Sequence, residues 1–115
     1  MRLETELIAA RLLKCHDAIA AKKTPDTVTP SDLLPYGKLC DDVNLSHLTR
    51  VVGVFLGELA EWCHDKSLPP LNSLAINAEE MKPGPGYKDA VSCSEINWWN
   101  EVKACIGAKY PASIS

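Results

Sequence analysis

The chain has 115 residues, of which 46% are hydrophobic and 23% charged, and its formal net charge is −3. This length suits one domain, and the composition excludes collagen, a long coiled coil and wholesale disorder. No apolar run reaches the roughly 18 residues that a transmembrane helix needs, and the first residues are acidic where a signal peptide is basic. We therefore expect a single soluble, cytoplasmic domain over 1–115 that binds no membrane.

The five cysteines are odd in number, scattered along the chain, and never spaced as Cys-x-x-Cys. This pattern indicates reduced thiols rather than a disulfide framework. We expect them to act as small buried hydrophobic side chains.

The first half of the chain predicts two helices with a loop between them. Apolar residues recur about once per turn over 3–23, with acid at the start and lysine at the end, which predicts an amphipathic helix. Two prolines and several capping side chains make 24–34 an internal loop. Pro35 can open a short helix over 36–43.

A long helix is predicted over 46–66, where apolar residues follow steps of three and four. Asn44 and Ser46 are suitable caps for its first turn. Gly53 and Gly57 each cost about 1 kcal/mol against alanine in a helix interior, so we expect another backbone to approach them closely.

The second half predicts a hairpin followed by a helix. Residues 71–77 favour a strand, a Pro-Gly-Pro-Gly run favours a loop tip, and 87–93 can form the returning strand, giving a two-stranded hairpin at 71–92. A last helix is predicted over 95–106, and 111–115 is expected to be a frayed tail.

No motif in the sequence predicts catalysis or a bound metal. Cys15-His16 and Cys63-His64 are adjacent pairs, and neighbours on a helix point about 100° apart, so the four side chains cannot easily converge on zinc or form a Cys-His nucleophile. The acids at 58, 61 and 65 lie on a face predicted to be solvated. We expect no metal and no cofactor.

The order of elements, with a turn before the long helix and a hairpin after it, predicts an α+β winged helix-turn-helix domain. Its residues resemble one family. Leu34-Pro35-Tyr36-Gly37 is similar to a Pro-Tyr-Gly helix start, Arg50-Val51-Val52-Gly53 to an Arg-Ala-Val-Gly recognition helix, and Gly86-Tyr87 to a Gly-Tyr after the wing. Over about 33–106 the chain resembles the DNA-binding domain of methylguanine-DNA methyltransferases and their non-enzymatic relatives, the alkyltransferase-like proteins.

The resemblance implies a noncatalytic protein that binds double-stranded DNA. Tyr36 would contact a phosphate, Arg50 would fill the place of a base flipped out of the duplex, and Ser46, His47 and Thr49 would lie near the DNA. The family's Pro-Cys-His-Arg segment aligns with Pro70-Leu71-Asn72-Ser73, so Leu71 stands in place of the methyl-accepting cysteine. Alkyl transfer by that route is excluded.

Charge and aromatic content leave an alternative open. Residues 45–68 and 78–89 each carry two basic and three acidic side chains, whereas a surface that meets phosphates should be basic. The alternative is a protein-protein interaction or self-associating module, a homodimer for example, on the same scaffold. Its interface would use Trp62, Trp98, Gly53 and Gly57. A small-molecule sensor or enzyme with a pocket beside Trp99 is a third possibility.

Overall fold

The computed structural model describes residues 1–114, and within them helices predominate over a very small sheet. The α-helices and strands are, in chain order, α1 (Leu3–Ala20), β1 (Leu34–Pro35), α2 (Tyr36–Asp42), α3 (Val52–Asp65), β2 (Ala75–Ile76) and α4 (Trp98–Gly107). Between them lie the 3-10 helices η1 (Pro30–Asp32), η2 (Ser46–Val51), η3 (Leu71–Leu74) and η4 (Pro85–Asp89). This content confirms the predicted α+β class.

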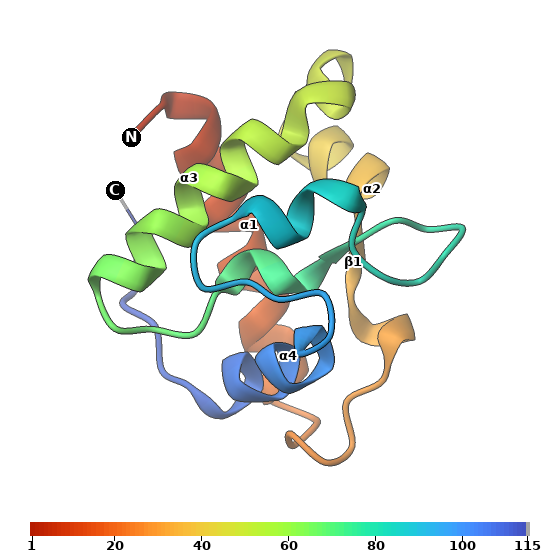
Figure 1. Ribbon diagram of the computed structural model, residues 1–115, viewed down its shortest axis with the longest axis vertical. Helices are drawn as coiled ribbons and strands as arrows, with labels where there is room; N and C mark the ends of the chain where they lie inside the picture. Colours follow the sequence, from red (N-terminus) through yellow and green to blue (C-terminus); the bar gives the residue numbers. More distant parts are fainter. Residues whose placement is uncertain (115) are drawn as a thin grey trace.

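The core lies where η3 packs against α1, α3 and α4. In Figure 1, α3 runs across the front of the molecule, α1 passes behind it, and α4 lies at the lower end. Fully buried side chains come from each of these elements: Ile8, Leu12, Leu59, Leu71, Leu74 and Val102. Each such side chain contributes about 1.5–3 kcal/mol relative to exposure, so η3 is a central part of the fold.

Helix α1 begins as predicted, with Glu4 and Glu6 in its first turn, but it ends at Ala20 instead of residue 23. The backbone N–H of Lys23 still bonds to the Ile19 carbonyl at 2.8 Å, and Pro25 has no N–H with which to continue the helix. The Lys23 ammonium lies 3.3 Å from the Asp32 carboxylate. The predicted lysines therefore lie just beyond the last turn of α1, which itself holds no basic residue.

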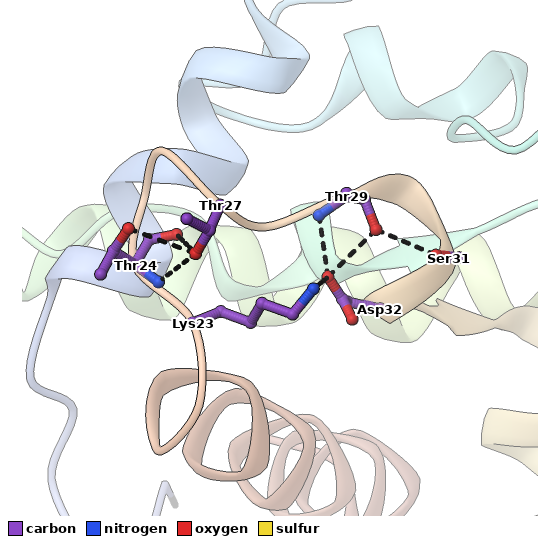
Figure 2. Close-up of polar contacts among 6 residues, drawn as sticks. All are labelled: Lys23, Thr24, Thr27, Thr29, Ser31 and Asp32. Carbon is purple, nitrogen blue, oxygen red and sulfur yellow. Dashed lines mark hydrogen bonds and ion pairs between the residues drawn. The ribbon is translucent and has the colours of Figure 1, made fainter.

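The 24–34 connection contains the 3-10 helix η1 and the first residue of β1, and its own side chains order it (Figure 2). The Asp32 carboxylate accepts the backbone N–H of Thr29 at 2.8 Å and meets Lys23. Thr27 Oγ1 accepts the backbone N–H of Thr24 at 2.8 Å. These bonds satisfy backbone groups that would otherwise need water, so the loop has a defined path into β1.

We expect Asp32→Ala to destabilise the fold by about 1 kcal/mol, the usual effect of losing a capping side chain. The Thr29 N–H, together with Lys23, holds the pKa of Asp32 below its ordinary value. The stabilisation is therefore present at neutral pH and is lost as the pH falls through the lowered pKa. Urea unfolding at pH 7 and at pH 3 measures it. Asp26→Ala, an exposed acid in the same loop, is the control and should change little.

The turn between α2 and α3 differs from the predicted helix cap. Asn44 adopts a left-handed conformation with φ 62°, and the N–H groups of Asn44 and Leu45 bond to the carbonyls of Asp41 and Cys40. This is the Schellman arrangement, so Asn44 ends α2 and does not cap the next helix. No side-chain hydrogen bond caps η2, and the predicted helix 46–66 is 3-10 helix to Val51 and α-helix from Val52 to Asp65.

The predicted hairpin at 71–92 is wrong. Residues 71–74 are helical, and β2 pairs in parallel with β1 so that Leu34 lies opposite Ala75 and Pro35 opposite Ile76. Beyond β2 only an isolated antiparallel bridge joins Asn77 and Lys82, at the base of a turn that projects from the body of the molecule in Figure 1.

Prolines explain why 83–92 does not return as a strand. Pro83 and Pro85 have no N–H to give to a ladder, and this segment is held by side chains instead. The Ser92 hydroxyl lies 2.6 Å from Nδ1 of His64, and the Asn72 amide donates to Cys93 Sγ at 3.5 Å. The segment therefore has a fixed path without a second strand.

Two features describe the C-terminal part. Helix α4 begins at Trp98, three residues later than expected, and ends at Gly107. In the 111–115 segment, which was expected to be a frayed tail, residues 111–113 are exposed, the Ile114 side chain is buried in the core, and Ser115 lies outside the described residues. Tyr110 also fixes this region by donating its hydroxyl proton to the Pro69 carbonyl at 2.6 Å.

All five cysteines are free thiols, as predicted, and Cys93 alone among them is not fully buried. None of the helices within residues 1–114 has both the length and the apolar character required to span a membrane.

Candidate functional site

A cavity of about 350 Å³ opens between α2, η2, α3 and η4. Its walls include Tyr36 from α2, Arg50 from η2, Gly57 from α3, Asn72 from η3 and Tyr87 from η4. Arg50 carries the one charge among the described residues that line it. Pockets of about 300–1,000 Å³ hold small ligands, so the cavity has room for one planar group of nucleobase size.

Tyr36 is half-buried at one wall, and its position is fixed by the loop that faces it. The hydroxyl oxygen of Tyr36 accepts the backbone N–H of Gly84 at 2.8 Å. The Gly84 backbone lies beside the Tyr36 ring, and a Cβ added at position 84 would be in ordinary van der Waals contact with that ring, at 3.5 Å. Because a phenol can donate as well as accept, the Tyr36 proton stays available to a ligand, and burial raises its pKa so that the group is neutral.

Tyr87 is buried at the other wall, and Glu101 of α4 holds it. The Tyr87 hydroxyl donates to the Glu101 carboxylate, which also accepts the backbone N–H of Ser94. Burial, with the Glu101 carboxylate second, raises the pKa of Tyr87. Glu101 therefore fixes both the aromatic wall and the segment that follows it.

Arg50 is exposed on η2. Asp42, one possible partner across the turn, is paired instead with Arg11 and Lys38, each at 2.9 Å. Within residues 1–114 no carboxylate forms an ion pair with Arg50. Its guanidinium is thus free to meet an anion at the cavity mouth.

The other three residues proposed to lie near DNA differ in position. Thr49 lines the cavity, but its hydroxyl donates to the Ser46 carbonyl at 2.8 Å. Ser46 and His47 are exposed on η2 and do not line the cavity. The fold thus gathers Tyr36, Thr49 and Arg50, and it leaves Ser46 and His47 on the surface beside them.

Gly53 and Gly57 line the cavity, and the expected close approach of another backbone to them is wrong. A Cβ added at either position would meet no neighbouring atom within 4 Å. The same glycines line a second, more acidic hollow with Glu58, Glu61 and Asp89. Their missing side chains keep open a surface on α3.

We expect Gly57→Ala to stabilise the protein by about 0.5–1 kcal/mol, because alanine is the better helix former and the new methyl group meets open space. The same methyl group reduces the cavity, so any ligand that fills it should bind more weakly. Thermal unfolding and a binding titration measure the two effects. Gly37→Ala, on α2 and away from the cavity, should leave binding unchanged; a loss of stability in Gly57→Ala would contradict this account of α3.

Trp62 and Trp98, the proposed interface anchors, do not lie at the cavity. Trp98 is half-buried, donates its indole N–H to the Ser73 carbonyl at 2.9 Å, and packs edge-on against Trp99 with ring centroids 5.3 Å apart. Trp62 is half-buried with the Lys66 ammonium 5.8 Å from its ring centroid. Neither ring is free of contacts within the chain.

Asn72 and Tyr87 are site residues that the sequence reasoning did not select. Asn72 is 2% exposed, and its side-chain carbonyl oxygen has no hydrogen-bond partner within residues 1–114. The aligned segment Pro70–Ser73 carried the available signal, because it places Asn72 beside the position of the family's reactive cysteine. Tyr87 could have been selected in the same way, because Gly86-Tyr87 is similar to the family's Gly-Tyr after the wing.

The thiols and the possible metal ligands are arranged for packing. Burial raises the pKa of Cys63 and Cys93, and it raises that of Cys105 to about 11. His16 Nε2 lies 2.8 Å from the Cys105 carbonyl oxygen. Within the part of the chain that the structure describes, no three histidine, cysteine or acidic side chains gather as a metal site.

Comparison with protein-family models, with characterised protein sequences and with solved structures gives no significant match.

Proposed function

We propose that this chain is a noncatalytic DNA-binding protein of the alkyltransferase-like type. In this proposal α2, η2 and α3 act as the helix-turn-helix of a winged-helix scaffold, and the 77–90 segment takes the place of a hairpin wing. The duplex lies along η2, and the cavity receives a group extruded from it.

One observation carries the proposal: Tyr36, Thr49 and Arg50 line a single cavity in which Arg50 is the charged residue. A neutral phenol and an unpaired guanidinium are suitable donors for phosphate oxygens. Of the acids of α3, Glu58 and Glu61 lie at the neighbouring hollow, and Glu58 there accepts the backbone N–H of Arg2 at 2.7 Å. These carboxylates do not line the cavity itself, where Arg50 is the charged residue.

The thiols support the noncatalytic part of the proposal. Alkyl transfer to protein needs a thiolate that the ligand can reach. Leu71 occupies the aligned position and is fully buried, and Cys93, whose thiol contacts the Asn72 amide, has a raised pKa. This arrangement favours a protein that binds DNA without accepting an alkyl group from it.

Gel-shift titration at low salt, with intact, mismatched and alkylated duplexes, tests the proposal. We expect binding that weakens as salt rises, since phosphate contacts release counterions, and a preference for duplexes from which a base is easily extruded. Mass spectrometry after incubation should show an unmodified protein. The absence of any shift at low salt would refute the proposal.

Exposed valines favour the second candidate function, a protein-interaction or self-associating module. Val51, the last residue of η2, is 46% exposed, and Val54 in the first turn of α3, next to Gly53, is 50% exposed. An apolar helix face with a glycine between the valines can pack against a second chain. Sedimentation equilibrium separates the candidates, because a strict monomer that binds DNA excludes self-association as the main role.

A further inference from the structure

We infer that Asn72 is the specificity-determining residue of the cavity, and that its side-chain carbonyl accepts an N–H from a planar nitrogen heterocycle such as a nucleobase. The inference rests on the proposed function for the source of that ligand, a base extruded from DNA. Its chemistry is argued from the cavity itself.

The amide of Asn72 is incompletely bonded in a place where that is costly. Its nitrogen donates to Cys93 Sγ at 3.5 Å, whereas its oxygen has no partner among residues 1–114. A buried carbonyl oxygen without a donor destabilises a fold, and most such atoms in proteins are satisfied. Because Asn72 also lines the cavity, a ligand there can supply the missing donor.

The second asparagine of the cavity shows the contrast. Asn77 also lines it, but its side-chain oxygen accepts the backbone N–H groups of Glu79 at 2.9 Å and Glu80 at 3.2 Å. Asn77 is therefore used to build the turn that follows β2. By contrast, the side-chain oxygen of Asn72 accepts no hydrogen bond from the described residues.

The rest of the wall restricts the ligand to a flat and largely apolar group. Val52 and Leu56 contribute aliphatic surface, and the rings of Tyr36 and Tyr87 contribute aromatic surface. The tyrosine hydroxyls are already bonded to Gly84 and Glu101, so their rings are held in place. A heterocycle with an exocyclic amino group fits both the apolar walls and the single buried acceptor.

Titration with two matched pairs of nucleosides tests the inference: adenosine against purine riboside, and guanosine against inosine. Each pair differs by one amino group. We expect at least one amino compound to bind about tenfold or more tightly than its partner, because the partner lacks the exocyclic amino N–H that the Asn72 oxygen would accept. The NMR signals of the Asn72 side-chain NH₂ group should shift with that compound.

The Asn72→Leu variant gives a second, independent measurement. It should abolish the difference within the pair while its melting temperature does not fall, since leucine removes a buried unpaired polar atom. Asn100→Leu is the matched control, because Asn100 is exposed on α4 and does not line the cavity, and this variant should keep the difference.

Equal affinity for both members of both pairs would overturn the inference, and so would a lower melting temperature for Asn72→Leu with the discrimination retained. If Asn72→Leu fails to fold, the wild-type affinities and the NMR shift still decide whether Asn72 binds the amino group of the ligand. The duplex gel shift is read separately, so nucleoside discrimination without a duplex shift removes the proposed function and keeps the role of Asn72.

Discussion

Arg50→Ala should weaken DNA binding by about 1–3 kcal/mol, or about 5- to 150-fold, while stability stays within about 0.5 kcal/mol of the wild type. The loss follows from the position of Arg50 at the cavity, where it is the charged lining residue. Stability is spared because the side chain is exposed and, within residues 1–114, forms no ion pair. Gel-shift titration and urea unfolding of the same preparation measure both quantities.

Arg11→Ala is the matched control, because it removes the same charge from α1. Arg11 donates to Asp42 at 2.9 Å and joins α1 to α2, so its loss should lower stability slightly and leave DNA affinity nearly unchanged. The slope of log affinity against log salt concentration should decrease in magnitude by about one for Arg50→Ala, because one phosphate contact is lost. It should stay unchanged for Arg11→Ala. If Arg50→Ala loses stability while DNA binding is unchanged or absent, the DNA-binding role that the resemblance implies is rejected.

The helices could be predicted from the sequence because their apolar periodicity is strong. The segment that begins at Leu3 and the one that ends at Asp65 match their predicted positions within a few residues. The clearest error occurs where a single residue decides a local path, because Asn44 closes α2 instead of capping the next helix. Local propensity ranks such residues correctly for turns, but it does not say which neighbouring helix they serve.

The sheet could not be predicted in the same way. Each strand has two residues, Leu34–Pro35 and Ala75–Ile76, and so short a strand shows no alternation. Their parallel pairing joins segments about forty positions apart, and no turn motif marks it. The sequence of 71–77 favours extended backbone, and the contacts of η3 with three helices favour a compact 3-10 turn instead.

The candidate site could likewise be predicted from the sequence only in part. Tyr36 and Arg50 could be selected because short motifs resemble a family that uses them. Asn72 could not be, since its significance lies in an atom without a partner, which only the packing of η3 against Cys93 reveals. The hydrogen bond from Tyr87 to Glu101 could not be predicted either, because it joins two separate elements, η4 and α4.

Leu71→Ala should destabilise the protein by about 2–5 kcal/mol, the range for truncating a buried leucine. The resemblance aligns Leu71 with a reactive cysteine, whereas the structure places its side chain at 0% exposure in η3, which packs on α1, α3 and α4. Such a loss is a large part of the total stability of about 5–15 kcal/mol that small domains have. Urea unfolding measures it, with Leu3→Ala, 67% exposed, as a control that should change little.

Leu71→Cys separates a packing role from a lost catalytic one. Leu71 does not line the cavity, so a thiol at this position would be buried away from a ligand and would have a raised pKa, as Cys63 and Cys105 have. We expect this variant to lose less stability than Leu71→Ala and to stay unalkylated, by mass spectrometry, after incubation with an alkylated duplex. Transfer of the alkyl group to the Leu71→Cys variant would show that position 71 is reached by the ligand and would contradict the assignment of this residue to the core.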